Sequence, residues 1–377
     1  MKTILFVSHE HSSVLGCTLS LYNLIHSLPK DYNPIVLIPN KGPAYDFFQS
    51  KQITCLVSKF HVDFVGEGYG IKYFLTFPIR IIRDYYQNTK TIFSIKHQLQ
   101  DVRVDVVHTN TSSINIGPKL AKQLNAAHVW HLREMMDLSM GFQPLLGWKR
   151  LKKQIASSDA VISITEAVAK HHGVYGRKKS YVIFDAVRSI HDIVYHPNKE
   201  KYFIFCGAIS PIKSPDIAVK AFEIFNKNIP GYRLKFVGNY KDSVKNDLLN
   251  LTNSETQANI EFLGYSEKVD ELISKASALL MCSQYEGQGR VSIEAMFMSC
   301  PLIARNAGGT KEIVFHMKNG ILFDTIEECA EAMKQVVTDK DLSKNLISEA
   351  LNYAKENFLE ETYGQKMREI YNSITSK

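Results

Sequence analysis

Short apolar runs alternate with amphipathic stretches along most of the 377-residue chain. In the first half, helical patterns such as residues 19–28 separate the apolar runs. Strands that alternate with helices in this way predict a parallel sheet that is covered on both faces. The predicted strands of this half are residues 4–7, 34–38, 104–107, 127–130 and 160–164.

A polar stretch at residues 185–200 interrupts this pattern, and we predict that it is an interdomain linker. The alternation then resumes, which indicates a second sheet of the same kind. We therefore predict an α/β fold with two Rossmann-like domains, at residues 1–185 and 186–355, followed by a terminal helix at 356–377. The strands predicted in the second half are residues 202–206, 234–237, 259–262, 278–282 and 301–304.

The composition is typical of a globular protein, with 45% hydrophobic and 22% charged residues. The first residues lack the pattern of a signal peptide, and no apolar run reaches the length of a membrane span. The six cysteines are scattered without a C-x-x-C pair, so we expect neither a zinc site nor a disulfide framework. These features lead us to expect a cytoplasmic location.

Positive charge is concentrated in the first half, where 22 Lys and Arg oppose 13 Asp and Glu. Residues 71–96 combine six aromatic and five basic side chains with a single Asp84. A basic, aromatic-rich stretch predicts binding to an anionic membrane surface, on the inner face of the cytoplasmic membrane. The alternative is an ordinary helix packed on the first domain, and Pro78 predicts that the helix is broken. We expect no nucleic-acid partner, because no nucleic-acid motif is present.

The most informative segment is residues 283–296, which follow an apolar strand at 276–282 and pass through a glycine-bearing turn into a helix. Amides at a helix N-terminus attract anions. Glu286 on the turn and Glu294 in the helix would repel a phosphate, so they are better suited to accept hydrogen bonds from neutral hydroxyls. A ligand that has both phosphates and hydroxyls is a nucleotide-sugar.

The segment that extends from Glu286 through Glu294 to Glu312 resembles the donor-site signature of retaining GT-B glycosyltransferases of family 4. The matching residues are Glu286-x7-Glu294, Ala295-Met296, Pro301, Gly308-Gly309 and Glu312. The resemblance implies two Rossmann-like domains that face each other across a cleft, with the terminal helix packed back on the first domain. It also implies that Glu286 holds a donor-sugar hydroxyl and Glu294 the ribose hydroxyls. The intervening donor-binding residues would be Gly287, Gln288, Gly289, Arg290 and Val291.

Residues 207–213 follow a predicted strand and resemble the phosphate loop of the same family. Gly207 and Lys213 match this loop, and the resemblance implies that Lys213 neutralises the diphosphate. The chain departs from the pattern at two positions, because Ala208 stands where Arg is expected and Ser214 replaces a glycine. Our hypothesis is that Arg290 supplies the missing guanidinium, since Arg is suited to bidentate phosphate contacts.

In the first domain, His131 follows a predicted strand, and the resemblance makes it the candidate that approaches the donor sugar or the reacting centre. Arg133 and Glu134 beside it are expected on the acceptor side. His108 ends another predicted strand, and we expect it in the cleft without a chemical role.

The loop after the first strand contains one glycine of the pair that the family usually has there. Gly16 is expected to let the backbone approach the donor phosphate, and Cys17 stands in the place of the second glycine. Glu10 would serve acceptor hydroxyls or lie on the surface.

We thus expect a retaining hexosyltransferase that moves a sugar from a nucleoside-diphosphate donor, with a UDP-sugar favoured, to a glycan or lipid-linked acceptor in cell-surface polysaccharide assembly. His131, Lys213 and Glu286 are the expected catalytic residues, and no cofactor or metal is expected. Asp339 and Asp341 form a D-x-D triplet that we interpret as a helix-capping turn. The alternatives are a GT-B-fold UDP-sugar epimerase and an inactive donor-binding subunit of a glycan-assembly complex.

Overall fold

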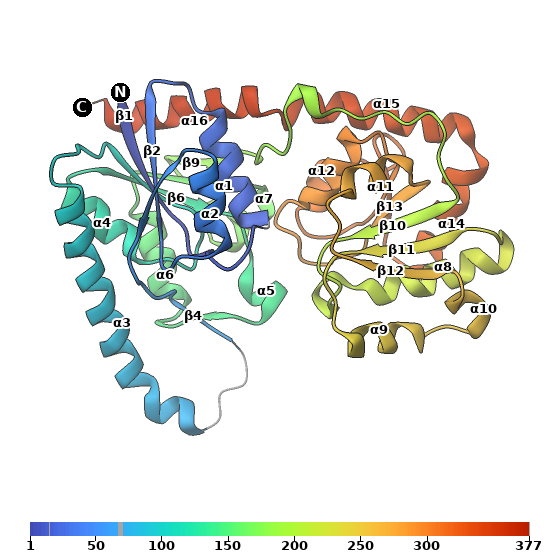
Figure 1. The fold of residues 1–377 in the computed structure, drawn as a ribbon, viewed down its shortest axis with the longest axis horizontal. Helices are drawn as coiled ribbons and strands as arrows, with labels where there is room; N and C mark the ends of the chain where they lie inside the picture. The colour runs from blue at the N-terminus through green and yellow to red at the C-terminus, as the bar shows by residue number, and fades with distance from the viewer. Residues whose placement is uncertain (15, 67–70, 377) are drawn as a thin grey trace. The chain divides into compact units, whose positions relative to one another are not determined.

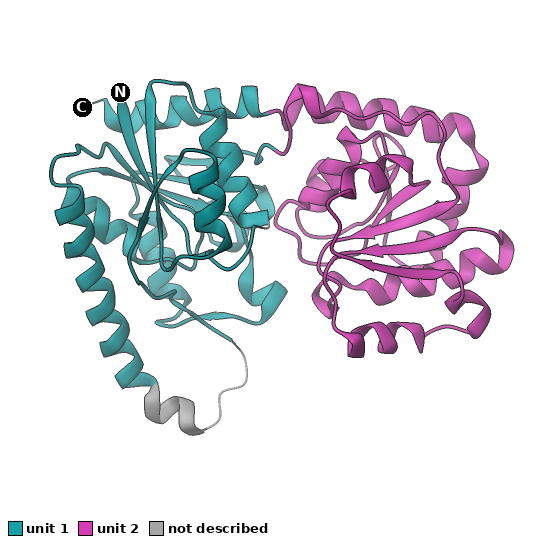
Figure 2. Ribbon diagram, in the orientation of Figure 1, with its two compact units in different colours: residues 1–186, 360–377 teal, residues 187–359 magenta. Residues whose placement is uncertain are grey.

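The computed structural model describes residues 1–14, 16–66 and 71–376, without the side chains of 71–76. The chain forms two compact units (Figure 2). Unit 1 comprises Met1–Ala186 and Glu360–Lys377, and unit 2 comprises Val187–Leu359. The chain therefore crosses between the units twice, one and four residues beyond the boundaries predicted at 185 and 355.

Unit 1 contains a parallel seven-stranded sheet in the order β3-β2-β1-β5-β6-β8-β9. A short antiparallel pair, β4 (Phe64–Val65) and β7 (Gln143–Pro144), lies outside this sheet. The strands of the large sheet are β1 (Lys2–Val7), β2 (Tyr32–Ile38), β3 (Thr54–Val57), β5 (Val106–Thr109), β6 (Ala127–Leu132), β8 (Ala160–Ser163) and β9 (Ser180–Val182).

Helices cover both faces of this sheet, as the strict alternation along β1 requires. Ile4 and Phe6 pack toward α1, α2 and α16, whereas Leu5 and Val7 pack toward α3 and α4. The helices of unit 1 are α1 (Gly16–Ser27), α2 (Pro43–Ser50), α3 (Ile71–Gln98), α4 (Ile116–Leu124), α5 (Met136–Met140), α6 (Trp148–Ala156), α7 (Glu166–His171) and α16 (Glu360–Thr375).

The terminal helix α16 belongs to unit 1 and lies along α1 (Figure 1). Tyr363, Met367 and Tyr371 on this helix are buried in the same cluster as β1. Gly364 allows the closest approach, because a Cβ at this position would overlap the backbone carbonyl of Ser27 at the end of α1. The last segment of the chain thus completes the core of the unit that contains the first.

Unit 2 contains a parallel six-stranded sheet in the order β12-β11-β10-β13-β14-β15. Its core is rich in phenylalanine, including Phe203, Phe222, Phe225 and Phe236. The strands are β10 (Tyr202–Cys206), β11 (Arg233–Val237), β12 (Ile260–Gly264), β13 (Ala278–Met281), β14 (Leu302–Arg305) and β15 (Ile321–Phe323). The helices are η1 (Ile190–Asp192), η2 (Pro211–Lys213), α8 (Pro215–Asn228), α9 (Asp242–Leu249), α10 (Ser254–Gln257), α11 (Val269–Lys275), α12 (Arg290–Phe297), α13 (Thr310–Ile313), α14 (Ile326–Thr338) and α15 (Lys340–Asn357).

The interpretation of residues 185–200 as a linker is wrong. The chain crosses between Ala186 and Val187, and the rest of this polar stretch belongs to unit 2. Several of its polar side chains are exposed, but others bond to unit 2. For example, the Lys199 ammonium donates to the carbonyls of Ser274 and Ser299, at 2.6 and 2.7 Å.

Two predictions about helices have different outcomes. The predicted break at Pro78 is wrong, because α3 continues through this residue for 28 residues in total. A proline within a helix removes one backbone hydrogen bond, the one that its N–H would donate to the carbonyl four residues earlier. The helix tolerates this loss because the buried side chains of Ile92 and Ile95 hold its later turns on unit 1. The capping turn at Asp339 is confirmed, since its Oδ1 accepts from the Leu342 amide at 2.9 Å.

In the part of the chain that the structure describes, no helix combines the length and apolarity of a membrane span.

Candidate functional site

In unit 2, Glu286 lies on the turn between β13 and α12, and a second loop fixes its backbone. Gly309 donates its amide to the Glu286 carbonyl at 2.8 Å. Gly308 has a left-handed φ of 56°, and a Cβ there would lie 2.9 Å from both the amide nitrogen and the carbonyl oxygen of Glu286. Only glycine therefore fits at position 308. Gly308 and Gly309 pack directly against the backbone of Glu286 and hold its loop in place.

The predicted phosphate loop meets this turn, because β10 and β13 are neighbours in the sheet. The Lys213 ammonium lies 2.5 Å from Glu286 Oε1, so two predicted donor-site residues are brought together. Gly207 has a φ of 127° at the end of β10. Ser214 has a φ of 51°, the left-handed conformation for which glycine is favoured, and Ala208 is exposed.

Glu294 lies in α12, and two arginines hold its carboxylate. Arg290 Nε is 3.0 Å from Glu294 Oε1, and Arg188 Nη2 is 3.9 Å from the same oxygen. Arg290 Nη2 also donates to the Val187 carbonyl at 3.2 Å. The guanidinium that we expected on the diphosphate thus contacts Glu294 and the backbone in this structure, and its phosphate role stays a prediction.

The remaining predicted donor residues surround the start of α12. Gln288 is buried, Gly287 and Val291 are half-buried, and Gly289 caps the helix with a φ of 76°. The first turn of a helix leaves amides without intrahelical partners, and these amides attract an anion. The structure therefore brings the residues that we predicted on the donor side together at one end of the unit 2 sheet.

Two hydroxyls at this helix start were not foreseen from the sequence. Ser292 and Thr310 are fully buried, and within the described residues neither side-chain oxygen has a hydrogen-bond partner. A Cβ on Gly289 would lie 3.2 Å from Thr310 Oγ1 and 3.4 Å from Ser292 Oγ. The only available signal was the position of Thr310 directly after the two glycines of the donor signature.

In unit 1, Glu134 follows β6 and holds the loop that follows β5. Its Oε1 accepts from the Ser112 amide at 2.7 Å, from Ser112 Oγ at 2.8 Å and from Thr111 Oγ1. Three donors therefore converge on one oxygen of a residue that we predicted on the acceptor side. The loop at residues 111–113, which the sequence analysis did not single out, is part of the same cluster.

Glu10 organises its own loop in a similar way. Its Oε1 accepts from the Ser12 amide at 2.9 Å, from Ser12 Oγ at 2.8 Å and from the Ser13 amide at 3.2 Å. Partial burial tends to raise the pKa of Glu10, but the Ser12 and Ser13 bonds outweigh burial and hold the pKa below its ordinary value. The carboxylate is thus ionised and engaged through one oxygen.

The prediction that His131 approaches the donor sugar is wrong. Its side chain is fully buried, because Val129 and His131 alternate onto the face of β6 that packs against the cluster containing α16. His131 Nδ1 lies 3.2 Å from His108 Nε2 and 3.2 Å from Arg133 Nη2. Burial, with the charge of Arg133 in support, holds the pKa of His131 well below its ordinary value, so the ring is neutral.

His108 is also buried rather than exposed in a cleft, so that prediction is wrong as well. Its Nδ1 lies 2.8 Å from the Tyr371 hydroxyl of α16. Burial likewise holds the pKa of His108 well below its usual range. The histidine pair therefore ties the sheet to the terminal helix.

Arg133 is almost fully buried and forms an ion pair with Asp185, the second residue before the chain leaves unit 1. Its Nε also donates to Asn110 Oδ1 at 3.1 Å. Asp185 Oδ1 accepts in turn from the Tyr363 hydroxyl of α16 at 2.9 Å. Asp185 could not be identified from the sequence, because these partners lie far from it in the chain, at the end of β6 and in α16.

Gly16 is the first residue of α1, and a Cβ there would meet no atom within 4 Å. Space alone does not require a glycine at this position. The neighbouring Cys17 accepts from Asn110 Nδ2 at 3.6 Å, and burial raises its pKa to about 11. Cys17 is therefore a protonated thiol and no nucleophile at neutral pH.

Comparison with known proteins assigns the family. The model of Glycosyltransferase Family 4 matches residues 16–188, and that of Glycosyl transferases group 1 matches residues 187–353. The chain is 24% identical over 286 residues to an uncharacterized glycosyltransferase of Methanocaldococcus jannaschii, covering 74% of this chain and 78% of the relative. It is 24% identical to the poly(ribitol-phosphate) alpha-N-acetylglucosaminyltransferase of Staphylococcus aureus, covering 69% of this chain and about half, 52%, of that relative.

Solved structures share the fold over the whole chain. Anabaena Alr3699/HepE, solved in complex with UDP and glucose, superposes with a TM-score of 0.77 at 18% identity and covers 99% of this chain and 100% of that one. S. aureus TarM, solved as a G117R mutant with fondaparinux, alpha-GlcNAc-glycerol and UDP, gives 0.76 at 14% identity with the same coverage. The two adjoining family models and the shared fold agree with the donor signature, and the chain belongs to the GT-B glycosyltransferases of family 4, group 1.

Proposed function

We propose that this glycosyltransferase moves a hexose, with retention of anomeric configuration, from a nucleotide-sugar to a hydroxyl of a glycan or lipid-linked acceptor in cell-surface polysaccharide assembly. A UDP-sugar is the favoured donor. The observation that carries the proposal is the grouping of Lys213, Glu286, Glu294 and the start of α12 at one end of the unit 2 sheet.

In the proposed reaction, the bond between the sugar C1 and the β-phosphate oxygen breaks, and its electron pair stays on the departing diphosphate. The acceptor hydroxyl bonds to C1 from the same face, and its proton passes to the departing phosphate. Lys213 and the amides at the start of α12 would stabilise the developing negative charge, which is the most effective place for preorganised donors. Glu286 and Glu294 would hold the donor sugar and the ribose, and Arg290 would join the phosphate site only by leaving Glu294 and Val187.

The names of two relatives support a polymeric acceptor. One is named a poly(glycerol-phosphate) alpha-glucosyltransferase and another a poly(ribitol-phosphate) alpha-N-acetylglucosaminyltransferase. Structural neighbours hold UDP or UDP-glucose. We extend these names to the present chain only as the class of donor and acceptor to test first. We also propose that the reaction needs no metal, because Lys213 and helix amides supply positive charge to the diphosphate.

The first experiment measures nucleotide release from UDP-, GDP-, ADP- and CMP-sugars by the wild type and Glu294→Ala. Glu349→Ala, on the exposed face of α15, is the matched control. We expect slow release from one donor, unaffected by EDTA, that is retained in the control and lost in the Glu294 variant. If no donor is hydrolysed and none raises the melting temperature of the wild type, the donor-site assignment fails.

The same assay separates the alternatives. An inactive donor-binding subunit would be stabilised by one nucleotide-sugar without releasing nucleotide, with or without acceptor. A UDP-sugar epimerase would convert the sugar in the absence of any acceptor, which chromatography of the recovered sugar detects.

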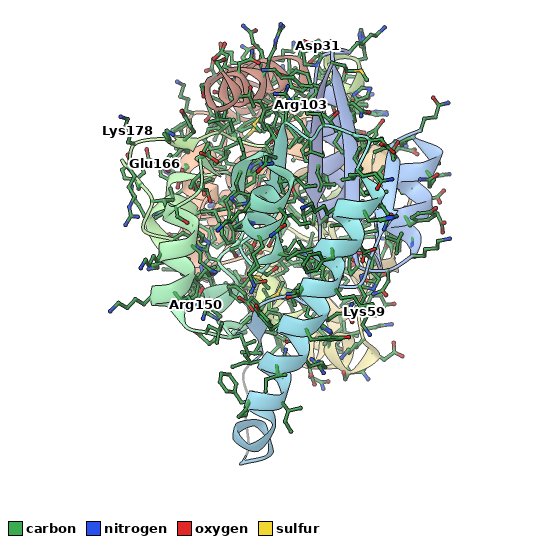
Figure 3. All side chains as sticks on the ribbon, turned by 90° about the vertical axis from the view of Figure 1, so that its left-hand side faces the viewer. Asp31, Lys59, Arg103, Arg150, Glu166 and Lys178 are labelled. Carbon is green, nitrogen blue, oxygen red and sulfur yellow. The ribbon has the colours of Figure 1, made fainter. Side chains whose placement is uncertain are left out.

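We further propose that α3 docks unit 1 on an anionic membrane surface. Figure 3 views unit 1 from the side on which α3 lies. Ile79, Ile82, Tyr86 and Phe93 are spaced to form one stripe of this helix, and each is more than 60% exposed. The exposed basic residues that flank this stripe are Arg83, Lys90 and Lys96. Such a helix is suited to lie in the headgroup region with its cationic flanks on anionic lipids.

Vesicle co-sedimentation tests this proposal with phosphatidylglycerol-containing and purely phosphatidylcholine vesicles. We expect the wild type to bind only the anionic vesicles, and Ile82→Glu to abolish binding. Leu251→Glu changes an exposed leucine of unit 2 and should bind like the wild type. Equal binding of the wild type and the Ile82 variant would reject the docking surface.

A further inference from the structure

The carboxylate of Glu294 is held by two arginines, and this arrangement defines a role for both of them. We propose that Arg188 and Arg290 are positioning residues that fix the Glu294 carboxylate for the ribose hydroxyls of the nucleotide. The proposal rests on the proposed function, in which Glu294 binds the ribose. It assigns to Arg290 a role different from the phosphate contact expected from the sequence.

The geometry of Arg290 restrains the carboxylate from one side. Its Nε lies 3.0 Å from Glu294 Oε1, one turn later on α12, while Nη2 donates to the Val187 carbonyl at 3.2 Å. The side chains of Arg290 and Glu294 are 17% and 13% exposed. Ion pairs between residues four apart contribute little on an open surface, where both side chains move freely. Here the guanidinium is anchored on a backbone carbonyl, so it defines one place for the carboxylate.

Arg188 approaches the same oxygen from a fixed segment. Its Nη2 lies 2.8 Å from Asp270 Oδ1 and 3.9 Å from Glu294 Oε1, and the Arg188 side chain is 19% exposed. The backbone is held as well, because the Val187 amide donates to the Phe358 carbonyl at 3.0 Å and Arg188 forms a β-bridge with Leu359. The buried Arg188 Nε has no acceptor among the described residues, and Nη2 of the same guanidinium contacts Asp270 and Glu294.

Both arginines lie within 4 Å of Glu294 Oε1, so they restrain the carboxylate for binding to the ribose. An ionised carboxylate only accepts hydrogen bonds, and the cis-diol of a ribose offers two donors. A glutamate fixed in one rotamer binds such a diol without losing side-chain freedom on binding, and this preorganisation increases affinity. Removal of either guanidinium should therefore weaken recognition of the ribose hydroxyls more than recognition of the diphosphate.

The test is isothermal titration of wild type, Arg188→Ala, Arg290→Ala, Arg290→Lys and Glu294→Ala with UDP, 2′-deoxy-UDP, 3′-deoxy-UDP and uridine. Hydrogen bonds to charged groups lead us to expect a roughly 10- to 100-fold loss of wild-type affinity when a ribose hydroxyl is removed. We call the affinity for UDP divided by the affinity for a deoxy-UDP the deoxy ratio. In both Arg→Ala variants, we expect the deoxy ratio to fall at least about fivefold, toward its value in Glu294→Ala. The UDP-to-uridine ratio should stay unchanged. Arg290→Lys, which keeps the charge but lacks the fork, should lie between Arg290→Ala and the wild type.

Combined variants and a control complete the design. Arg290→Ala should have little further effect on UDP affinity in a Glu294→Ala background, because the arginine acts through the glutamate. Arg233→Ala removes an exposed arginine that forms an ion pair with Glu261 elsewhere in unit 2, and it should keep every wild-type ratio.

Three outcomes would contradict the proposal in different ways. In Arg290→Ala, the affinity for UDP relative to deoxy-UDP could stay at the wild-type value while the affinity for UDP relative to uridine falls. This result would make Arg290 a diphosphate ligand and overturn its positioning role. Lower melting temperatures with unchanged ratios would leave both arginines purely structural. Failure of the wild type to bind UDP, GDP or ADP would instead refute the proposed function, and the positioning role would fall with it.

Discussion

Unit 1 contains buried neutral histidines, and they should make it unstable in mild acid. His128 and His172 are each at most 5% exposed. Burial lowers the pKa of His128 to about 4, although the Asp159 carboxylate acts in the opposite direction. Burial also lowers the pKa of His172 to about 4. In the unfolded chain, both rings would titrate near the ordinary value of about 6.5.

The sign of the effect follows from these values. Between pH 6.5 and about 4, the unfolded chain binds protons that the folded protein does not, so stability falls as pH falls through this window. From pH 7.5 to pH 5, each ring should contribute a loss of about 2 kcal/mol, or about 4 kcal/mol for the pair. His108 and His131 have lowered pKa values for the same reason and act in the same direction.

The assay can be made specific for unit 1, because both tryptophans of the chain, Trp130 and Trp148, lie in it. Urea unfolding followed by tryptophan fluorescence at pH 7.5 and pH 5 would give the free energy of unfolding at each pH. His128→Gln removes one titrating ring, so its stability loss should be about 2 kcal/mol smaller than that of the wild type. His97→Gln changes an exposed histidine and should reproduce the wild-type loss.

His128→Gln should also lower stability at both pH values, since His128 Nε2 lies 2.8 Å from Thr109 Oγ1 and Nδ1 lies 2.9 Å from Ser158 Oγ. The informative quantity is therefore the difference in the free energy of unfolding between pH 7.5 and pH 5, and not its value at either pH. An equal loss in the wild type and the variant would show that His128 does not titrate in this way. Higher stability at pH 5 would refute the account of all the buried histidines.

Three further predictions concern the backbone. Gly308→Ala should destabilise unit 2 by about 1–2 kcal/mol through its left-handed φ, and the clash with Glu286 should weaken UDP binding in the same titration. Gly364→Ala should lower the melting temperature and reduce the free energy of unfolding by about 1–3 kcal/mol, because the new Cβ would overlap the Ser27 carbonyl. Alanine's better helix propensity would offset only part of this loss, and unchanged stability would contradict the close packing. Pro78→Ala should raise stability by about 2 kcal/mol in thermal unfolding if α3 is continuous, whereas a neutral effect would argue for a broken helix.

The grouping of the expected donor residues in unit 2 could be predicted from the sequence because its determinants are local. Glu286, Gly289 and Glu294 fall within nine residues that form one strand–turn–helix unit, so their grouping follows from short-range geometry. The contact between Lys213 and Glu286 needed one more step, the adjacency of β10 and β13. Loops at the carboxyl ends of neighbouring parallel strands meet at one edge, which makes this step predictable too.

The surroundings of the candidate residues in unit 1 could not be predicted in this way. His131 was placed correctly at the end of a strand, but its face depends on the register of β6 and on a helix more than 200 residues later in the chain. Tyr371 of α16 contacts His108, and Tyr363 contacts Asp185. No local pattern in the sequence marks these partners. From the sequence alone, the residues of a buried polar network therefore could not be distinguished from residues that face a ligand.

The departures from the family pattern acquire a different meaning once the backbone is known. Ser214 replaces a glycine, yet it adopts the left-handed φ of 51° that the glycine would have had, and Lys213 beside it still contacts Glu286. The loop thus keeps its conformation at the cost of a strained serine, which is roughly 1–2 kcal/mol. A loop that no longer served a ligand would have no reason to retain such strain. This geometry favours a loop that still binds a ligand, which an active enzyme and a donor-binding subunit would share. Loss of donor binding in Lys213→Ala with normal folding is the expected result, and normal donor binding in this variant would contradict a ligand role for the loop.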